Sequence, residues 1–321
     1  MALQQDTRHV GTLLAVSSAV AFSTAGLFTR LISVDAWTIL FWRGLFAGLF
    51  VAGYIAWRHR AQSWTAIRAM GWIGFVPAAC TTLSTICFIN ALRLTDVADV
   101  MVIAATAPFI TTALTWLWTG QRESAVTLVA SAVALAGVML MFDAGLSFDH
   151  LVGNLLALAM AVLISIPKVV IRQRRETSML PAMCLGALAC APAVLPFASP
   201  TAVTGMDFVY LVLFGATQFG LGLLLITIAT RLISATRSAL IESLDTPLAP
   251  IWVWLAFGEM PRLMTCIGGA IVMLAVIADM LLSSHRSADG QHGGRAWWTS
   301  IKATLSSCGS MVRPRSCASR E

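Results

Sequence analysis

Ten apolar segments of transmembrane length limit this chain to one class of fold. They lie at residues 11–31, 38–57, 70–92, 98–119, 125–142, 151–171, 179–198, 207–230, 237–257 and 263–284. A helix needs about 20 apolar residues to cross the hydrocarbon core of a bilayer. Charged residues make up 11% of the chain, whereas a soluble domain contains about 25%. The segments therefore predict an all-α polytopic membrane protein with ten transmembrane helices.

Short polar loops divide the chain into four regions. These are an N-terminal segment (1–10), a first set of five helices (11–142), a second set of five helices (151–284) and a basic tail (285–321). Basic residues favour the cytoplasmic side of a membrane protein. With both termini in the cytoplasm, most arginines lie at inner loops or helix ends, and Arg30, Arg93 and Arg262 lie at outer ones. This distribution, with the short loops and scarce lysines, predicts a multi-pass protein of a bacterial inner membrane.

Several classes of partner are not expected. The net charge of +6 is spread over loops and the tail rather than gathered on a soluble face, so nucleic acid is not a predicted partner. The seven cysteines include no CxxC pair and no Cys/His cluster with zinc spacing. The sequence also contains no P-loop for direct use of ATP. We therefore expect no metal and no cofactor, and we expect the lipid bilayer as a partner.

The two sets of helices resemble each other in sequence. Residues 91–121 align with residues 229–259 if two one-residue shifts are allowed. The alignment matches an A-x-R-L start, a mid-segment proline, a pair of tryptophans and a glycine before Gln121 or Glu259, and Arg30 likewise corresponds to Arg172. Five helices per copy would invert the second copy in the membrane. Transporters built from inverted repeats bind their substrates near the bilayer midplane, where the two halves meet.

In these features the chain resembles the drug/metabolite transporter superfamily, in its EamA-type branch of ten helices. The resemblance rests on the order of G-T-L-L-A near the start, F-W-R at 41–43, A-L-R-L-T at 91–95, Pro108 and P-L-A-P-I-W-V-W-L-A-F-G-E at 247–259. One departure is Gln121, where the family usually has a loop glutamate. The resemblance implies a bundle with a central cavity that moves small metabolites by alternating access. It also favours an acidic residue beside Pro247.

The most informative segment is LIESLDTPLAP at 240–250, because it places two carboxylates in a membrane helix. Ionisable residues within a membrane are functional candidates by default. Glu242 and Asp245 are three residues apart and share a helix face that extends to Trp252. Such a face suits a cavity that binds a cationic or aromatic group, and a carboxylate there could carry a coupling proton. A surface ion pair with nearby arginines is the alternative for Glu242.

Other polar residues within the segments are further candidates. Arg43 could anchor an anionic group of a substrate or extend to the membrane interface. Lys168 could pair with Glu242 or Asp245, or turn toward the arginines near Arg172. Gln218 and Thr106 are weaker candidates for the cavity wall, and Asp279 is expected to be structural.

Prolines in two of the segments predict hinges. Pro247 and Pro250 each remove one backbone donor, and Pro108 does the same in the first half. A freed carbonyl in a membrane must be satisfied by protein or by water in a cavity. We therefore expect these segments to line a wet cavity and to bend during transport.

The favoured function is a secondary transporter, most simply an exporter, of small amino-acid-like or drug-like metabolites. Proton coupling through Asp245 and Glu242 is an open option, and the oligomeric state is not indicated. Two alternatives are a non-transporting sensor or scaffold and a membrane-embedded enzyme. The enzyme is disfavoured because the sequence has no HExxH or GxSxG motif and its histidines lie outside the apolar segments.

Overall fold

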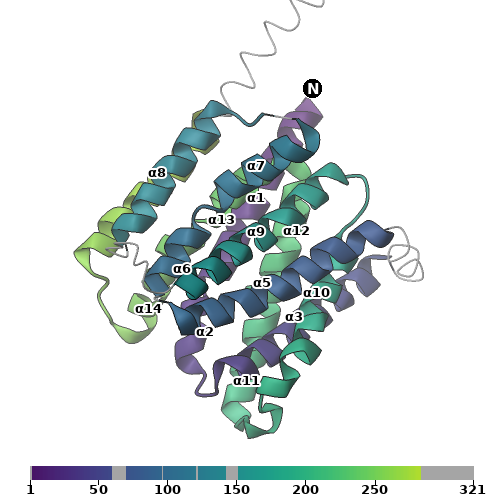
Figure 1. Cartoon of the computed structure of the whole chain (residues 1–321), viewed down its shortest axis with the longest axis vertical. Coiled ribbons are helices and arrows are strands. Elements are labelled where there is room, and N and C mark those ends of the chain that lie inside the picture. The colour runs from purple at the N-terminus through teal and green to yellow at the C-terminus, as the bar shows by residue number, and fades with distance from the viewer. Residues whose placement is uncertain (1, 60–69, 96, 121, 142–150, 283–321) are drawn as a thin grey trace, which may run out of the picture.

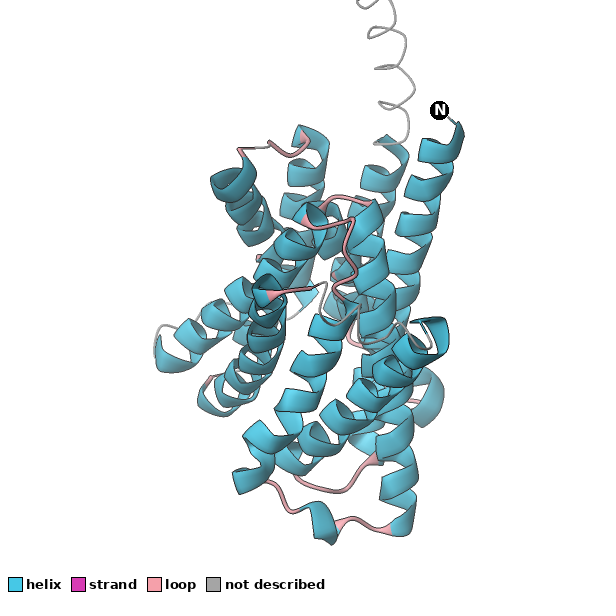
Figure 2. Ribbon diagram, turned by 90° about the vertical axis from the view of Figure 1, so that its right-hand side faces the viewer, coloured by secondary structure: helices cyan, strands magenta, loops and turns pink. Residues whose placement is uncertain are grey.

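The computed structural model describes residues 2–59, 70–95, 97–120, 122–141 and 151–282. All regular secondary structure within these residues is helical (Figure 2). The predicted basic tail at 285–321 and Gln121 lie outside the described residues. An all-helical fold agrees with the composition, because helices satisfy their backbone groups internally where no water is available.

The first half of the chain forms helices of very different lengths. They are α1 (Ala2–Ser23), α2 (Ala25–Leu31), α3 (Ala36–His59), the 3₁₀ helix η2 (Trp72–Gly74), α5 (Phe75–Leu94), α6 (Val97–Ala104), α7 (Ala107–Thr119) and α8 (Ala125–Met141). Figure 1 shows α8 along one edge of the bundle and α3 and α5 toward the other.

The second half repeats this pattern with one irregular helix. It comprises α9 (Leu151–Gln173), α10 (Leu180–Val194), the 3₁₀ helices η3 (Leu195–Phe197) and η4 (Pro200–Ala202), α11 (Gly205–Leu213), the π-helix η5 (Phe214–Leu221), α12 (Gly222–Leu232), α13 (Ala235–Glu242), α14 (Asp245–Phe257) and a last helix, Leu263–Leu282.

Eight of the helical stretches are long and apolar enough to cross a membrane. The two remaining predicted segments are helical but shorter. Helix α8 has 17 residues, and the segment predicted at 237–257 is divided into α13 and α14. The chain is thus a multi-pass membrane protein, and its number of crossings as ten stays a prediction.

The internal repeat is visible in the backbone. Helices α6 and α13 each have 8 residues, α7 and α14 each have 13, and two residues separate the members of each pair. Each pair ends at a glycine with positive φ, Gly120 or Gly258, whose amide donates to a tryptophan carbonyl four residues earlier at 2.8 Å. Glycine suits this position because it adopts positive φ without steric cost. These four helices and the two glycines correspond with one constant offset, so this part of the structural repeat needs no one-residue shift.

Helix packing also follows the repeat. The most extensive contacts join α5 to α9, α3 to α10 and α1 to α12. If each helix is replaced by its counterpart in the other half, the contact of α5 with α9 becomes the contact of α12 with α1. The contact of α3 with α10 stays the same. The close approaches obey the same rule, since a Cβ atom on Gly11 of α1 would lie 2.7 Å from Leu232 Cβ, and one on Gly153 of α9 would lie 2.6 Å from Thr95 Cβ.

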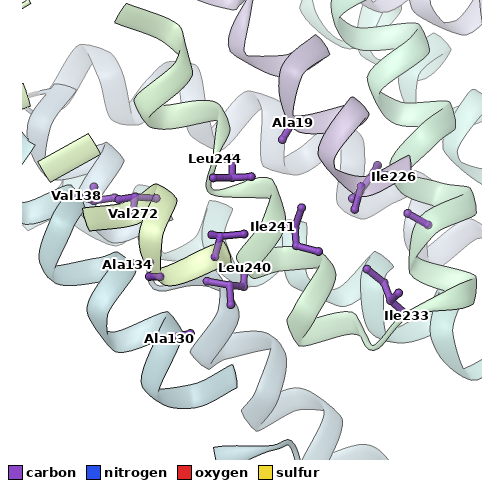
Figure 3. Close-up of a cluster of buried hydrophobic side chains, with 14 of the residues drawn as sticks. Ala19, Ala130, Ala134, Val138, Ile226, Ile233, Leu240, Ile241, Leu244 and Val272 are labelled. Carbon is purple, nitrogen blue, oxygen red and sulfur yellow. The ribbon is translucent and has the colours of Figure 1, made fainter. Parts of the chain in front are cut away.

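The largest apolar cluster joins the two halves (Figure 3). Leu240, Ile241 and Leu244, in and just after α13, occupy its middle, between small side chains of α8 and α1 such as Ala134 and Ala19. Small residues permit close helix contact in membrane proteins, where water does not drive association between helices.

A buried ion pair fixes one side of this cluster. Arg237 Nε of α13 lies 3.1 Å from Asp279 Oδ2 on the last helix, and the Thr127 hydroxyl of α8 donates to Asp279 Oδ1 at 2.8 Å. Asp279 is fully buried. Its pairing with an arginine agrees with the structural role expected for this residue.

Replacing Gly153 by alanine tests the close contact between α9 and α5. The added methyl group would also meet the backbone of Leu94 at 2.8 Å, which cannot turn aside. We expect Gly153→Ala to lower the free energy of unfolding by roughly 1–3 kcal/mol through overpacking. Thermal unfolding in detergent measures this. Gly53→Ala is the control, because nothing lies within 4 Å of its Cβ position, and an equal loss in both variants would contradict the prediction.

Candidate functional site

A central cavity of about 350 Å³ lies between helices of both halves. We call it the central cavity, and its polar lining consists of Arg43, Thr81, Ser84, Thr85, Lys168, Gln218, Thr227, Thr230, Glu242 and Asp245. A pocket with apolar walls and a few polar groups is the usual form of a small-molecule site. The expected candidates Asp245, Glu242, Arg43, Lys168 and Gln218 therefore share one space, although their roles stay predictions.

The two carboxylates lie on either side of a helix break. Glu242 is the last residue of α13 and Asp245 is the first of α14. Pro247 has no amide hydrogen for the carbonyl of Ser243, and this carbonyl instead accepts from the amide of Thr246 at 3.3 Å. The break thus brings both carboxylates to the cavity.

Glu242 forms a buried ion pair with Lys168. Lys168 Nζ lies 2.7 Å from Glu242 Oε2, and the two side chains are 9% and 22% exposed. Lys168 also donates to the carbonyl of Ile164 at 3.3 Å. Of the open alternatives, the structure therefore shows Lys168 paired with Glu242 rather than turned to the arginines near Arg172. Glu242 faces the cavity rather than a surface arginine.

Asp245 and Arg43 form no ion pair among the described residues. Asp245 Oδ1 accepts a hydrogen bond from the Thr246 hydroxyl at 3.1 Å. The Arg43 guanidinium carbon lies 4.3 Å from the ring centroid of Phe219, and Arg43 Nε is buried without a hydrogen-bond partner. The cavity thus offers one carboxylate and one guanidinium of opposite charge for other groups to bind.

Gln218 lines the same cavity and belongs to the π-helix η5. Its Nε2 donates to the carbonyl of Phe22 at 3.3 Å, whereas its Oε1 is buried without a partner. Single π-helical turns are common at functional sites. The sequence pattern did not reveal this π-helix, and Phe219 was not identified as the aromatic surface under Arg43.

Two expected site residues do not line the cavity. The Trp252 indole N–H donates to Ser23 Oγ at 2.8 Å, and Trp252 lies outside the lining of the cavity. Trp252 shares α14 with Asp245, but its indole turns to α1 instead of the cavity, and its role in binding stays a prediction. Thr106 also lies outside the lining, and its hydroxyl bonds to the carbonyl of Ile103 at 2.6 Å. Local bonding of this kind is common for threonine in helices.

The prolines differ in position relative to the helix breaks. Pro108 and Pro247 lie in the first turns of α7 and α14, directly after breaks. Pro250 lies inside α14, which continues through it, so the structure shows no break at this residue. A third break, between α1 and α2 at Thr24, has no proline and was not predicted.

A hydroxyl group stabilises each of the three breaks. The side chains of Thr24, Thr106 and Ser243 donate to carbonyls three residues earlier, at 2.7, 2.6 and 2.6 Å respectively. Each of these carbonyls also accepts the backbone amide of the same residue, so the hydroxyl adds a second hydrogen bond at the break. The same kind of bond also occurs within an unbroken helix, from Ser84 to the carbonyl of Thr81 in α5, so the hydroxyls alone do not locate the breaks.

A second hollow of about 740 Å³ adjoins the cavity. We call it the vestibule, and its rim includes the exposed residues Arg30, Glu259 and Arg262. The cavity and the vestibule share Phe22, Ala25, Met101 and Asp245. These shared residues lie near the three breaks, so the helices are interrupted where the two hollows meet.

Metal binding has no support in this geometry. Across the described parts of the chain, no group of three or more His, Cys, Asp or Glu side chains is placed to hold a metal ion. The charges of the cavity instead suit a polar or ionic organic solute.

Membrane-length helices around a charged internal cavity define a polytopic membrane protein of the transporter class. A family model described as the EamA-like transporter family matches residues 9–143 and 151–278. The chain therefore belongs to the EamA-like transporter family, within the drug/metabolite transporter superfamily. The two matched ranges agree with the two halves of the fold.

Other comparisons define the fold alone. A solved structure titled "Crystal structure of protein" superposes with a TM-score of 0.75 at 18% sequence identity, covering 86% of this chain and 98% of that one. No curated protein matches the chain.

Removal of Lys168 tests the buried ion pair. Lys168→Met leaves the Glu242 carboxylate without its partner, which we expect to cost about 1–3 kcal/mol of unfolding free energy. The double variant Lys168→Met/Glu242→Gln removes both charges and should recover at least half of this loss. Thermal unfolding of the purified variants measures both effects. If the loss in the double variant equalled the sum of the losses in Lys168→Met and in Glu242→Gln, the two side chains would not be coupled.

Proposed function

We propose that this protein is a secondary transporter that exports small amino-acid-like or drug-like metabolites by alternating access, with a proton exchanged at Asp245. The supporting observation is the central cavity, which holds buried or partly buried groups of both charges, of which Lys168 and Glu242 form a pair. Asp245 and Arg43 face the same cavity outside that pair.

Two of the four charged groups in the cavity form an ion pair, and the other two, Arg43 and Asp245, do not. This difference supports a dipolar solute. A charged side chain within a membrane is costly and is normally paired or placed in a functional cavity. Arg43 can bind a carboxylate through two parallel hydrogen bonds. Asp245 can bind an ammonium group. A solute with both groups would neutralise both side chains at once, as an amino acid does.

The position of Asp245 supports the proposed proton exchange. This residue lines both the central cavity and the vestibule. Its carboxylate can hold a proton or a cationic group of the solute, and either one neutralises it. Mutual exclusion at one carboxylate would link the outward movement of the solute to the inward movement of a proton.

The orientation of the halves belongs to the same proposal. The start of α1 packs on the end of α12, and the end of α9 is hydrogen-bonded to that same end of α12. Helices α1 and α9 therefore run in opposite directions, which supports inverted halves with ten crossings. With both termini in the cytoplasm of a bacterial cell, the vestibule faces outward.

Asp245→Asn tests the transport function. We expect cells with the wild type to accumulate one class of solute in the medium, and cells with Asp245→Asn to lose at least about 90% of this accumulation, as expected when an essential ionisable group is removed. Untargeted mass spectrometry of the medium measures it at matched membrane levels. Glu176→Gln is the control, because Glu176 is an exposed carboxylate outside the cavity. Equal export by all three proteins would contradict the role of Asp245.

Arg43→Gln tests the anion-binding role. Loss of a charge-assisted hydrogen bond costs about 1.5–3 kcal/mol, which corresponds to roughly 10- to 150-fold weaker binding of the exported solute. Competition binding to the purified protein measures this. An amide or ester analogue that lacks the carboxylate should bind wild type and Arg43→Gln with similar affinity. Full discrimination by Arg43→Gln between acid and ester would contradict the assignment.

A further inference from the structure

Arginines connect the helices at one end of the bundle. We call it the Arg172 end. Arg172, in the last turn of α9, donates to the carbonyl of Arg231 at the end of α12 at 2.8 Å. Arg231 in turn donates through Nε and Nη2 to the carbonyl of Arg175, at 2.8 and 2.5 Å. Helices α9 and α12 are therefore joined in both directions at this end.

A carboxylate between α7 and α8 extends this connection. Glu123 Oε2 accepts from the Ser234 hydroxyl at 3.2 Å and is attracted by Arg172. Burial raises the pKa of Glu123, although the hydrogen bonds from Ser234 and Thr236 and the charge of Arg172 oppose this shift. Glu123 follows Gln121 by two residues, so it supplies the loop glutamate that Gln121 does not.

The opposite end, which we call the Arg30 end, differs in one contact. Arg30 corresponds to Arg172 in the repeat, Arg93 corresponds to Arg231, and Glu259 to Gln121. Arg30 forms an ion pair with Glu259, and the two side chains are 49% and 53% exposed. Within the described residues Arg30 makes no hydrogen bond to the end of α5, and the vestibule opens beside it. The hydrogen bond from Arg172 to the carbonyl of Arg231 thus has no equivalent at the Arg30 end among the described residues.

We propose that Arg172 is the latch that holds its end of the bundle closed, and that Arg30 forms the matching contact with the carbonyl of Arg93 when the protein opens at the Arg172 end. This inference rests on the proposed alternating access. Two halves with equivalent folds can adopt two arrangements. In each arrangement, one half makes the contacts that the other half makes in the second arrangement. A contact that is present at the Arg172 end and absent at the Arg30 end is the contact that must interchange.

Hydrogen–deuterium exchange in lipid nanodiscs tests this proposal without a substrate. For Arg172→Gln we expect about tenfold faster amide exchange at the link between α12 and α13, as for loss of a charge-assisted hydrogen bond. We also expect slower exchange near Gly258 and Arg262 on the vestibule rim. The second change is the decisive one, because a purely structural role for Arg172 would loosen the Arg172 end alone.

Three further variants make the test specific. Glu123→Gln should produce the same pair of changes with smaller amplitude, and it replaces Arg172→Gln if that variant does not fold. Arg30→Gln should leave exchange at the Arg172 end at or below the wild-type rate. In Arg172→Gln/Arg30→Gln, exchange at the rim should equal that of Arg30→Gln alone, because Arg30 pairs with Glu259 at the rim and its loss is common to both variants.

The outcomes separate this inference from the transport proposal. Unchanged exchange on the vestibule rim in both Arg172→Gln and Glu123→Gln would overturn the latch. Reciprocal changes at the two ends would support it even if Asp245→Asn exported normally, in which case the assignment of Asp245 alone would be wrong.

Discussion

Backbone groups in a bilayer core find no water, and this constraint decides where the helices of this protein can break. Each of the three breaks uses a serine or threonine hydroxyl to satisfy a carbonyl three residues earlier. The breaks also lie where the central cavity meets the vestibule, beside Phe22, Met101 and Asp245. Interrupted helices are thus confined to the region where protein side chains and an internal space replace the missing backbone bonds.

The same constraint separates two groups of buried charges. Asp279 is fully buried, and it contacts both Arg237 and the Thr127 hydroxyl. This group connects α8, α13 and the last helix and lies outside the cavity. Arg43 and Asp245, in contrast, face the cavity without ion pairs among the described residues. Burial alone therefore does not distinguish the two groups, and the proposed function rests on the charges that face the internal space without an ion pair.

Much of the fold followed from hydrophobic segment length, because a membrane helix must carry enough apolar residues to cross the bilayer. All ten predicted segments are helical, and the repeated Pro, Trp and Gly residues of 91–121 and 229–259 lie in matching helices. The breaks were less accessible. Proline marked two of them, but the break at Thr24 has no proline, and neither has the π-helix at 214–221. Propensity rules describe regular helices and not their local exceptions.

The candidate site was predictable in composition but not in geometry. Charged residues in apolar segments are rare enough that Arg43, Lys168, Glu242 and Asp245 could be found without a structure. Trp252 follows Asp245 by two turns of α14, yet its indole bonds to Ser23 of α1, a contact that helical periodicity alone does not predict. The choice of Glu242 as the partner of Lys168 depends on how α9 packs against α13, and no local pattern contains that information.

The two halves share their shape but not their chemistry. Helices α7 and α14 match in length and end at equivalent glycines, yet the first residue of α7 is Ala107 and that of α14 is Asp245. Arg43 and Lys168 likewise each occur in one half alone, Arg43 on α3 and Lys168 on α9. An exchange of contacts between equal shapes requires that both halves fold alike, whereas selective binding of a dipolar solute requires that they differ at the cavity. The repeat therefore supplies the means of movement in the proposed cycle, and the departures from the repeat supply the binding groups.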